Sequence, residues 1–503
     1  MLDSLQKIRG VDLTRLLRDV RLFGADAIGV TSCCSDSRAC REGDLFVAIS
    51  GTRTDGHDYV EEAIANGATA VLAERILPLA DIPQAIVPDS REAYGKICHA
   101  LVGNPTKRLK AIGVTGTNGK TTTSCLIAAV LEAAGQTTGL MSTFGYYDGI
   151  ATAPPTLTTP AAPTLADTLA RSVANGCSHS VIEMSSHALA QRRTAGIDLD
   201  VVCVTGVQRD HLDFHNTLEN YHAAKARIFD HLSGDGFAVL NIDDEVCNDY
   251  LQTLNCPVLT IGIRGTAEIT ATVIERLPSE QTFLITAGTD TVPVRTHVIG
   301  DEHVYNCLTA TAVGLGYGFD LPTIVRGLES VKKVPGRLER IECGQPFSVF
   351  VDYAHTPDSL RTSLATLREV TQGKLTCVFG AGGNRDREKR PLMGQAVEEG
   401  ADMAIITDDN PRGEDPDRIV RHIIEGFTNF DSFEVEQDRE KAIHAALAAA
   451  KPGDCVLIAG KGHEQYQVIG NQRHPFDDRE AVRSWLKQSV RATFYSTPMR
   501  RTA

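Results

Sequence analysis

The sequence has 503 residues and is too long for one ordinary hydrophobic core, because single cores stop growing at about 250 to 300 residues, so we expect two to four domains. Apolar residues make up 42% of the chain and charged residues 23%, a balance that excludes disordered and fibrous chains and fits globular α/β enzymes. The formal net charge of −14 argues against non-specific binding to nucleic acid or anionic lipid, so an anionic substrate must meet a local cluster of positive charge.

The sequence gives no sign of export or membrane insertion. Residues 1–30 alternate charged and apolar positions, and no apolar run approaches the roughly 20 residues that span a bilayer. We therefore expect a cytoplasmic protein. Its thirteen cysteines are scattered, and Cys33-Cys34 are adjacent rather than spaced as a metal pair, which favours reduced, buried thiols.

Three α/β segments are expected in chain order. Residues 36–74 have their own strands and helix and precede the linker Asn104-Pro105-Thr106, which indicates a small N-terminal domain over 1–108. From residue 111, short β-branched runs alternate with glycine turns and helical periods, the pattern of a mainly parallel sheet over 109–337. Its expected strands are 111–114, 180–182, 201–204 and 237–240.

A second series of strands follows a hinge at 333–337, which contains Pro335-Gly336. The runs 348–351, 375–379, 403–406 and 455–458 each end at a turn with Asp, Gly or Asn. We expect a Rossmann-like α/β domain over 338–503, with ligands at the strand ends.

A glycine loop, Gly116-Thr117-Asn118-Gly119-Lys120-Thr121-Thr122, lies between the first central strand and a helix that Gly135 ends. Backbone N–H groups and a helix N-terminus in this position can hold phosphates, with Lys120 as the cation and Thr121 as a magnesium ligand. The general P-loop spacing is absent, because Val114 stands where its first glycine would be. The alternative is a glycine turn that caps the helix, and the lysine and two threonines in register favour phosphate binding.

This shortened loop resembles that of the Mur ligase and folylpolyglutamate synthase superfamily, and further motifs similar to those of the family run through most of the chain. They are Asp36-Ser37-Arg38, Thr158-Thr159-Pro160, Glu183-Met184-Ser185-Ser186-His187, Asp210-His211-Leu212-Asp213, Pro335-Gly336-Arg337, Asp352-Tyr353-Ala354-His355 and Gly460-Lys461-Gly462-His463-Glu464. The resemblance implies that the N-terminal domain holds a UDP sugar, the central domain ATP, and the C-terminal domain the incoming amino acid.

A carboxylate must be activated before an amine can displace its oxygen. ATP activates it by transferring a γ-phosphoryl group, which forms an acyl phosphate. Because the reacting groups are anionic, Mg²⁺ is expected, with Thr121, Glu183 and His211 as ligands. Alternatives are a helix-capping Glu183 and a core His211. Lys225, on the segment 221–232, would by itself be taken for a solvated lysine. The resemblance instead implies that it is carbamylated (N6-carboxylysine), catalytic with Lys120, Glu183 and His211, and faces the metal.

The resemblance assigns the remaining ligand contacts. Asn306, Arg337 and Asp352 would contact the adenine, phosphate and ribose of ATP. The alternatives are an intrahelical asparagine, a surface ion pair and a turn aspartate. The family often has asparagine where this chain has His303, and Asn-Leu where it has Gly206-Val207. The UDP-linked substrate would be contacted by Ser35, Ser37, Thr52, Arg53, Thr54, Thr158, Thr159, Ser185, Gln191 and Arg193.

The turn Asp409-Asn410-Pro411-Arg412 follows the strand 403–406, and its arginine suits the distal carboxylate of meso-diaminopimelate. The resemblance implies that the pocket around this turn consists of Arg390, Asp409, Asn410, Pro411, Arg412, Gly460 and Glu464. The alternative is an ordinary proline turn with Arg412 paired to Glu414 or Asp415.

We therefore expect a monomeric, ATP-dependent ligase that adds meso-diaminopimelate to UDP-N-acetylmuramoyl-L-alanyl-D-glutamate, a step of cell-wall peptidoglycan synthesis, without nucleic-acid partners. A lysine-adding Mur ligase, a folylpolyglutamate synthase-like ligase and a non-catalytic nucleotide-binding module are the alternatives.

Overall fold

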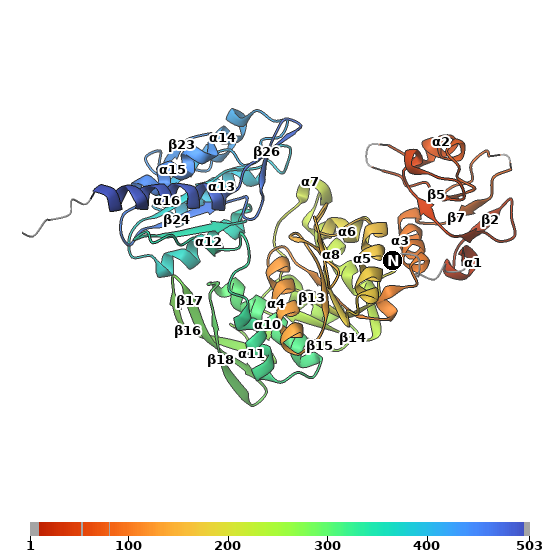
Figure 1. Ribbon diagram of the computed structural model, residues 1–503, viewed down its shortest axis with the longest axis horizontal. Helices are drawn as coiled ribbons and strands as arrows, with labels where there is room; N and C mark the ends of the chain where they lie inside the picture. Colours follow the sequence, from red (N-terminus) through yellow and green to blue (C-terminus); the bar gives the residue numbers. More distant parts are fainter. Residues whose placement is uncertain (1–9, 52–53, 80, 497–503) are drawn as a thin grey trace, which may run out of the picture.

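The computed structural model describes residues 10–51, 54–79 and 81–496, which form three α/β units in chain order. Figure 1 shows the N-terminal unit (red) and the C-terminal unit (blue) at opposite ends of the molecule, with the central unit between them. In the described part of the chain, no helix is both long and apolar enough to cross a membrane.

The N-terminal unit is built on a sheet with the strand order β2-β7-β6-β5-β4. Neighbouring residues of β5 point to opposite faces of this sheet, with Leu45 and Val47 in one core cluster and Phe46 in the other. Its elements are β1 (Val11–Asp12), α1 (Leu13–Leu16), β2 (Arg21–Phe23), β3 (Gly29–Val30), β4 (Cys33–Cys34), η1 (Ser37–Ala39), β5 (Leu45–Val47), η2 (Gly56–Tyr59), α2 (Val60–Ala65), β6 (Ala70–Ala73), β7 (Gln84–Ile86), α3 (Ser90–Leu101) and η3 (Pro105–Lys107).

The central unit is one long sheet, β11-β10-β9-β12-β8-β13-β14-β15-β16-β17-β18, parallel from β9 to β16 and antiparallel at both ends. Its strands are β8 (Lys110–Thr115), β9 (Thr138–Ser142), β10 (Gly145–Tyr147), β11 (Thr152–Ala153), β12 (His179–Glu183), β13 (Leu199–Val204), β14 (Leu232–Asn241), β15 (Val258–Gly262), β16 (Ile269–Leu277), β17 (Glu280–Ala287) and β18 (Asp290–Thr296).

Helices cover both faces of the central sheet. On one face Ile112 and Val114 of β8 share a core with α4 (Lys120–Ala133), α10 (Asp301–Gly316) and α11 (Leu321–Ser330), and on the other Ala111 packs with α5 (Ala162–Ala174) and α6 (Ser186–Ala190). The second face also carries α8 (Leu218–Ala226), η4 (Arg227–His231) and α9 (Glu245–Thr253), whereas the short α7 (Leu212–His215) lies in the connection from β13 to α8.

The C-terminal unit has the strand order β19-β20-β24-β21-β22-β23, parallel except for β19. Its elements are β19 (Glu339–Arg340), β20 (Ser348–Asp352), α12 (Pro357–Val370), β21 (Leu375–Phe379), α13 (Lys389–Gly400), β22 (Met403–Ile406), α14 (Pro416–Ile424), β23 (Phe433–Val435), α15 (Arg439–Ala449), β24 (Cys455–Ala459), β25 (Tyr466–Ile469), β26 (Gln472–Pro475) and α16 (Asp478–Ser496).

The predicted mainly parallel α/β fold is confirmed, and each expected strand run lies within an observed strand. The segment that carries Lys225 divides among three elements. The segment 221–232 is not a single helix, because α8 ends at Ala226, a 3₁₀ turn follows, and Leu232 already begins β14.

Candidate active site

The predicted phosphate loop joins the end of β8 to the first turn of α4. Gly116 and Gly119 have φ values of 150° and 81°, which side chains rarely adopt, and a Cβ on Gly116 would collide with Thr205. The Lys120 ammonium donates to the carbonyl oxygens of Gly116 and Thr117, both at 2.9 Å. The loop thus combines a helix N-terminus with a fixed cation, an arrangement that suits phosphate.

Glu183 ends β12 and is fully buried beside this loop. Its carboxylate accepts hydrogen bonds from the Thr121 hydroxyl at 3.1 Å and the Thr143 amide at 3.3 Å. The helix-capping alternative is wrong, because α6 is capped by Ser185, whose hydroxyl accepts from the Ala188 amide at 3.2 Å. Burial raises the pKa of the Glu183 carboxyl, although the nearby cations oppose the shift.

His211 precedes α7 in a left-handed conformation, with φ 55°. Its Nε2 lies 3.4 Å from the Asp210 carboxylate and 39% of its side chain is exposed, so the core-histidine alternative is wrong. Loss of hydration lowers the pKa of His211 to about 3, with His187 adding repulsion and Asp210 opposing it. The imidazole is therefore neutral near pH 7, the form that ligates metals.

Lys225 is only 1% exposed, so the solvated position that spacing alone suggests is wrong. Its Nζ donates to the Gly116 carbonyl at 2.6 Å and lies 4.8 Å from the centre of the Tyr221 ring. Burial first, and then repulsion from Lys120, lower the pKa of Lys225 well below its ordinary value. A neutral amine is thus accessible at this position.

One cavity of ≈ 400 Å³ brings most of these groups together. Its lining includes the predicted residues Gly116, Thr117, Asn118, Gly119, Lys120, Thr121, Thr158, Glu183, Ser185, Gln191, Arg193, His211, Lys225 and Arg337. The hydroxyl of Thr121, the carboxylate of Glu183 and the neutral imidazole of His211 are donors that Mg²⁺ accepts, so this lining fits a magnesium ion.

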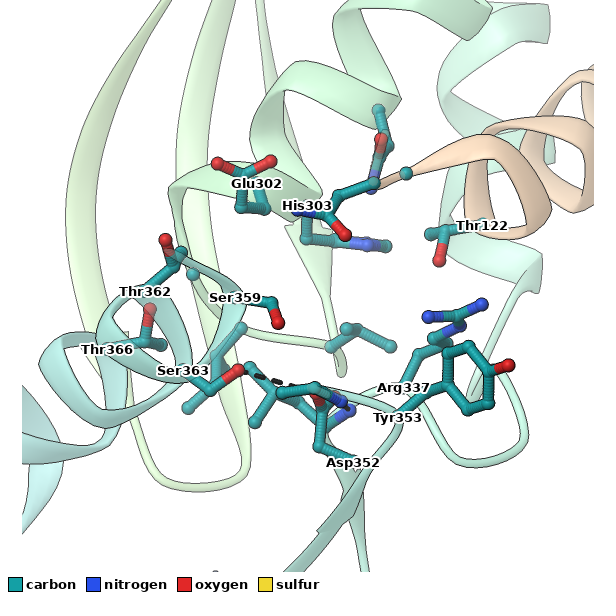
Figure 2. Close-up of a pocket in the computed structure, with 18 residues that line it drawn as sticks. Thr122, Glu302, His303, Arg337, Asp352, Tyr353, Ser359, Thr362, Ser363 and Thr366 are labelled. Carbon is teal, nitrogen blue, oxygen red and sulfur yellow. Dashed lines mark hydrogen bonds between the residues drawn. The ribbon is translucent and has the colours of Figure 1, made fainter. Parts of the chain in front are cut away.

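A second, narrower pocket opens between α4, α10 and the C-terminal unit (Figure 2). It is lined by the predicted nucleotide contacts Asn306, Arg337 and Asp352, together with Gly119 and Thr122 of the phosphate loop. His303 also faces it and is 3% exposed, and neither of its ring nitrogens has a hydrogen-bond partner among the described residues. Burial lowers the pKa of His303 to about 4, so its neutral ring offers one donor and one acceptor.

The predicted nucleotide contacts differ in how far their polar groups are already hydrogen-bonded within the protein. The Asn306 amide oxygen accepts from the Thr123 hydroxyl at 2.9 Å, and the Asp352 carboxylate accepts from backbone amides including that of Ala354 at 2.8 Å. Arg337 is not the surface ion pair of the alternative interpretation. Its guanidinium lies 4.5 Å from the centre of the Tyr353 ring and reaches the Thr121 hydroxyl at 3.5 Å.

The residues expected to contact the UDP-linked substrate fall into two groups. Thr158, Ser185, Gln191 and Arg193 line the cavity, and Thr159 lies behind Ser185. The Thr159 hydroxyl donates to the Glu183 carbonyl at 2.7 Å and accepts from the Ser185 amide at 3.0 Å. Ser35, Ser37 and Thr54 are instead in the N-terminal unit and do not line that cavity. The Ser37 hydroxyl is buried and donates to Glu62 at 2.5 Å, and Thr52 and Arg53 lie outside the described residues.

The expected amino-acid pocket surrounds the turn 409–412. Arg390 is fully buried and forms a bidentate ion pair with Glu414, while Asp415 lies 3.8 Å from Arg421. The alternative pairing of Arg412 with Glu414 or Asp415 is therefore wrong. Asp409 is buried beside Gly460, and the Pro411 carbonyl accepts from the backbone N–H of Glu414 at 3.1 Å, which closes the turn.

Sequence reasoning missed a buried lysine at this end of the site. Lys461 donates to Asn410 Oδ1 at 3.2 Å and to Glu464 Oε2 at 2.9 Å, and the Asn410 amide donates to the same Glu464 oxygen at 2.9 Å. Asp210 and Thr143 were missed as well. Lys461 and Asp210 stand inside motifs noted in the sequence, whereas nothing near Thr143 marks it.

Comparisons with known proteins match most of the chain. The Mur ligase middle domain matches residues 114–314, the Mur ligase glutamate ligase domain 336–462, and a Mur ligase family catalytic domain 30–102. A relative in Geobacillus thermodenitrificans, named UDP-N-acetylmuramoyl-L-alanyl-D-glutamate-2,6-diaminopimelate ligase, is 44% identical over 90% of this chain and 94% of its own. This chain belongs to the Mur ligase family. The expected resemblance and enzyme class, ATP-dependent amide-bond formation, are confirmed.

Solved structures agree with this family. A ligase of the same name superimposes with a TM-score of 0.68 at 34% identity, covering 96% of this chain and 99% of that chain. The folylpolyglutamate synthase of Mycobacterium tuberculosis gives 0.61 at 20% identity over 73% of this chain and 92% of its own, a likeness of fold alone. The fold is therefore shared by both kinds of ligase and does not decide between their substrates.

Proposed function

We propose that this Mur ligase joins meso-diaminopimelate to UDP-N-acetylmuramoyl-L-alanyl-D-glutamate in an ATP-dependent reaction. The observation that carries the proposal is the single cavity in which the phosphate loop meets Glu183, His211, Lys225 and Thr158. The 44% identical relative bears the name of this activity. Residues 1–108 would hold the UDP group, 109–337 ATP, and 338–503 the amino acid.

In the proposed reaction the terminal carboxylate of the dipeptide takes the γ-phosphoryl group of ATP, and ADP leaves. The amine of diaminopimelate then attacks the acyl phosphate, and phosphate leaves as the amide forms. Lys120, Arg337 and the phosphate-loop amides line the cavity and stabilise the charge on the transferred group.

The cofactor proposal is Mg²⁺ held by Thr121, Glu183, His211 and a carbamate on Lys225. When bound, the ion neutralises the anionic groups that must approach one another. Burial lowers the pKa of Lys225 and so favours the uncharged amine, which can add to CO₂ with loss of a proton; this supports carbamylation of Lys225. The monomeric state and cytoplasmic location stay predictions.

The deciding experiment measures phosphate release by the purified chain with ATP, the UDP-linked dipeptide and a panel of amino acids. We expect release only when diaminopimelate is added. Release with lysine would favour the lysine-adding alternative, and release with folate and glutamate a folylpolyglutamate synthase. No release with any of these substrates would favour the non-catalytic nucleotide-binding module.

A further inference from the structure

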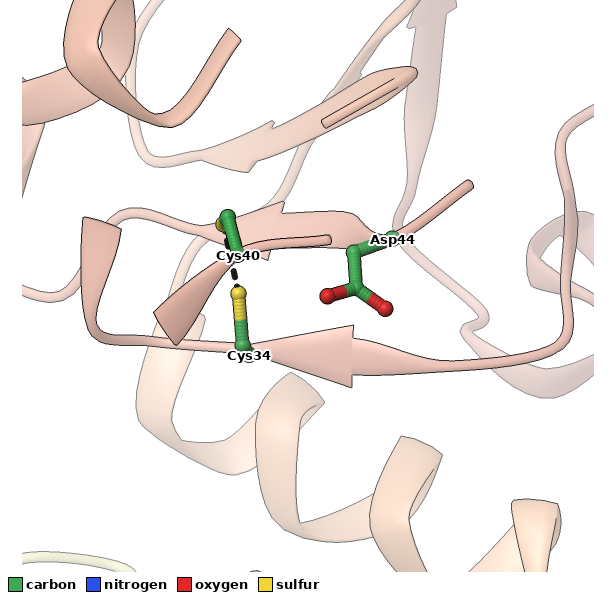
Figure 3. Close-up of side chains that lie close together, drawn as sticks. All are labelled: Cys34, Cys40 and Asp44. Atoms are coloured by element: carbon green, nitrogen blue, oxygen red, sulfur yellow. Dashed lines mark hydrogen bonds between the residues drawn. The ribbon is translucent and has the colours of Figure 1, made fainter. Parts of the chain in front are cut away.

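Two cysteines of the N-terminal unit lie in direct contact, far from the ligase cavity in the sequence and in the fold. Cys34 ends strand β4, and Cys40 follows the 3₁₀ turn η1. Their Sγ atoms are 2.6 Å apart, with the carboxylate of Asp44 close by (Figure 3). The sequence, which favoured scattered thiols, gave no reason to expect this contact.

Strand β4 presents one thiol to each face of its sheet. Cys34 packs against the cluster that contains Phe46, whereas Cys33 packs against the cluster that contains Leu45. The Cys33 sulfur lies 3.9 Å from that of Cys98. Cys33 is therefore adjacent to Cys34 on the same strand but lies on the other face of the sheet, so it serves as a control.

Three groups at this position, Cys34, Cys40 and Asp44, could in principle hold a metal ion. Two thiolates bound at about 2.3 Å to one tetrahedral ion lie about 3.8 Å apart, which is far from the observed 2.6 Å. The Asp44 carboxylate is also engaged already, by the Ser32 hydroxyl and by the Arg41 amide at 2.8 Å. The contact is much nearer the bond length of a disulfide, about 2.05 Å, so the geometry favours a disulfide over a metal ion.

We propose that Cys34 and Cys40 are a redox-active pair that a low-molecular-weight disulfide, such as oxidised glutathione, converts to an intramolecular disulfide. The more exposed Cys34 attacks the oxidant as a thiolate and releases one thiol, which leaves a mixed disulfide. Cys40 then attacks the Cys34 sulfur and releases the second thiol. Two electrons pass from the pair to the oxidant, and the two protons leave with the released thiols.

Burial raises the pKa of both thiols, which slows the exchange at neutral pH. The bridge would close a small loop over residues 35–39, whose shape is already defined. The Asp36 carboxylate accepts from the Arg38 amide at 3.1 Å, and the Asn66 amide donates to the Ser37 carbonyl at 3.0 Å. Oxidation should therefore stiffen this turn without reshaping it.

The test uses the full-length protein, equilibrated with either oxidised glutathione or dithiothreitol in mildly alkaline buffer, then alkylated and mapped by mass spectrometry. We expect a Cys34–Cys40 linkage that lacks two hydrogens in wild type and in Cys33→Ser, and none in Cys34→Ser or Cys40→Ser. Free, alkylated Cys34 and Cys40 in the oxidised sample would overturn the proposal. So would one zinc ion retained per chain that both thiols are needed to hold.

A second measurement tests the effect on the turn. Amide hydrogen exchange over residues 35–39 should slow on oxidation in wild type and Cys33→Ser but not in Cys34→Ser, and unchanged exchange would contradict stiffening. If the proposed ligase function also holds, the preorganised turn should lower KM for the UDP-linked dipeptide by about twofold or more while leaving KM for ATP unchanged. Because the mapping needs no substrate, failure of the thiol pair is distinguishable from failure of the ligase assignment.

Discussion

The Arg390 guanidinium and the Glu414 carboxylate form a buried, bidentate ion pair, with Nη1–Oε1 and Nη2–Oε2 distances of 3.0 and 2.8 Å. Glu414 also accepts from the Asn384 amide at 3.0 Å, and Arg390 donates to the Gly382 carbonyl at 3.3 Å. The pair therefore ties the loop after β21 to the turn that carries Arg412. This ion pair holds the backbone around the proposed amino-acid site in place.

Replacing Glu414 by alanine should be strongly destabilising, because it leaves the Arg390 charge buried without a partner, at a cost of about 3–5 kcal/mol. The measurement is the thermal midpoint of the transition that includes the C-terminal unit. Asp415→Asn is the matched control, since its ion pair with Arg421 is exposed and asparagine can still cap α14. Equal midpoints for the two variants would contradict the prediction.

The same pair predicts a pH dependence of stability. The Arg390 guanidinium lowers the pKa of Glu414 from 4.5 to about 2, so the folded protein binds this proton less readily than the unfolded chain. The stabilisation is therefore complete above about pH 4.5 and is lost as the pH falls toward about 2. In thermal unfolding, the difference between wild type and Glu414→Gln should shrink over that interval. A difference that grows on acidification would show the sign to be wrong.

Lys225→Ala should be nearly inactive and partly rescued by formate or acetate, because a small carboxylate can replace the anion of the proposed carbamate. Lys120→Ala is the matched control, since both lysines donate to the Gly116 carbonyl but Lys120 is expected to act as a cation. It should not respond to carboxylates. Rescue of both variants alike, or an unmodified Lys225 by intact mass in fully active enzyme, would contradict carbamylation.

His303→Leu should raise KM for ATP about tenfold, the effect of losing one hydrogen bond from a buried group to the base. His303→Asn, which keeps a donor and an acceptor, should stay within about threefold of wild type. His99 is the control, because both its ring nitrogens are also buried and have no partner in the part of the chain that the structure describes, but it lies in the N-terminal unit. If His99→Leu changed KM for ATP as much, the effect would be general rather than local.

The sequence predicted those parts of the molecule that are determined by residues contiguous in the chain. The runs 375–379 and 403–406 were found because an apolar β-branched stretch ends at a turn, and the phosphate loop because its glycines and lysine are contiguous. The burial of Lys225, the Lys461 contacts and the Cys34–Cys40 contact could not be predicted. Each depends on segments that meet only in the folded chain, and a lysine has no sequence pattern that distinguishes a buried position from an exposed one.

The Arg412 guanidinium is not paired with a protein carboxylate in the described part of the chain, as selection of diaminopimelate requires. Its backbone is fixed, because its amide donates to the Val468 carbonyl at 2.9 Å and its carbonyl accepts from Gly470 at 2.7 Å, which holds φ at 53°. Its guanidinium donates through Nη1 to the carbonyls of Gly383 at 2.9 Å and Asn410 at 3.4 Å, and it forms no ion pair with any residue that the structure describes.

A carboxylate on the incoming amino acid can therefore pair with Arg412 without displacing a protein carboxylate. Lysine lacks the distal carboxylate of meso-diaminopimelate, and a site built to bind that carboxylate can reject such an analogue by about 10⁴-fold or more in kcat/KM. Arg412→Ala should lose most of this discrimination, and Arg412→Lys should keep part of it, because an ammonium retains the charge but not the two-pronged geometry. The measurement is competition between lysine and meso-diaminopimelate in wild type and both variants. Equal use of the two amino acids by wild type, or unchanged discrimination in Arg412→Ala, would show that the selectivity arises elsewhere.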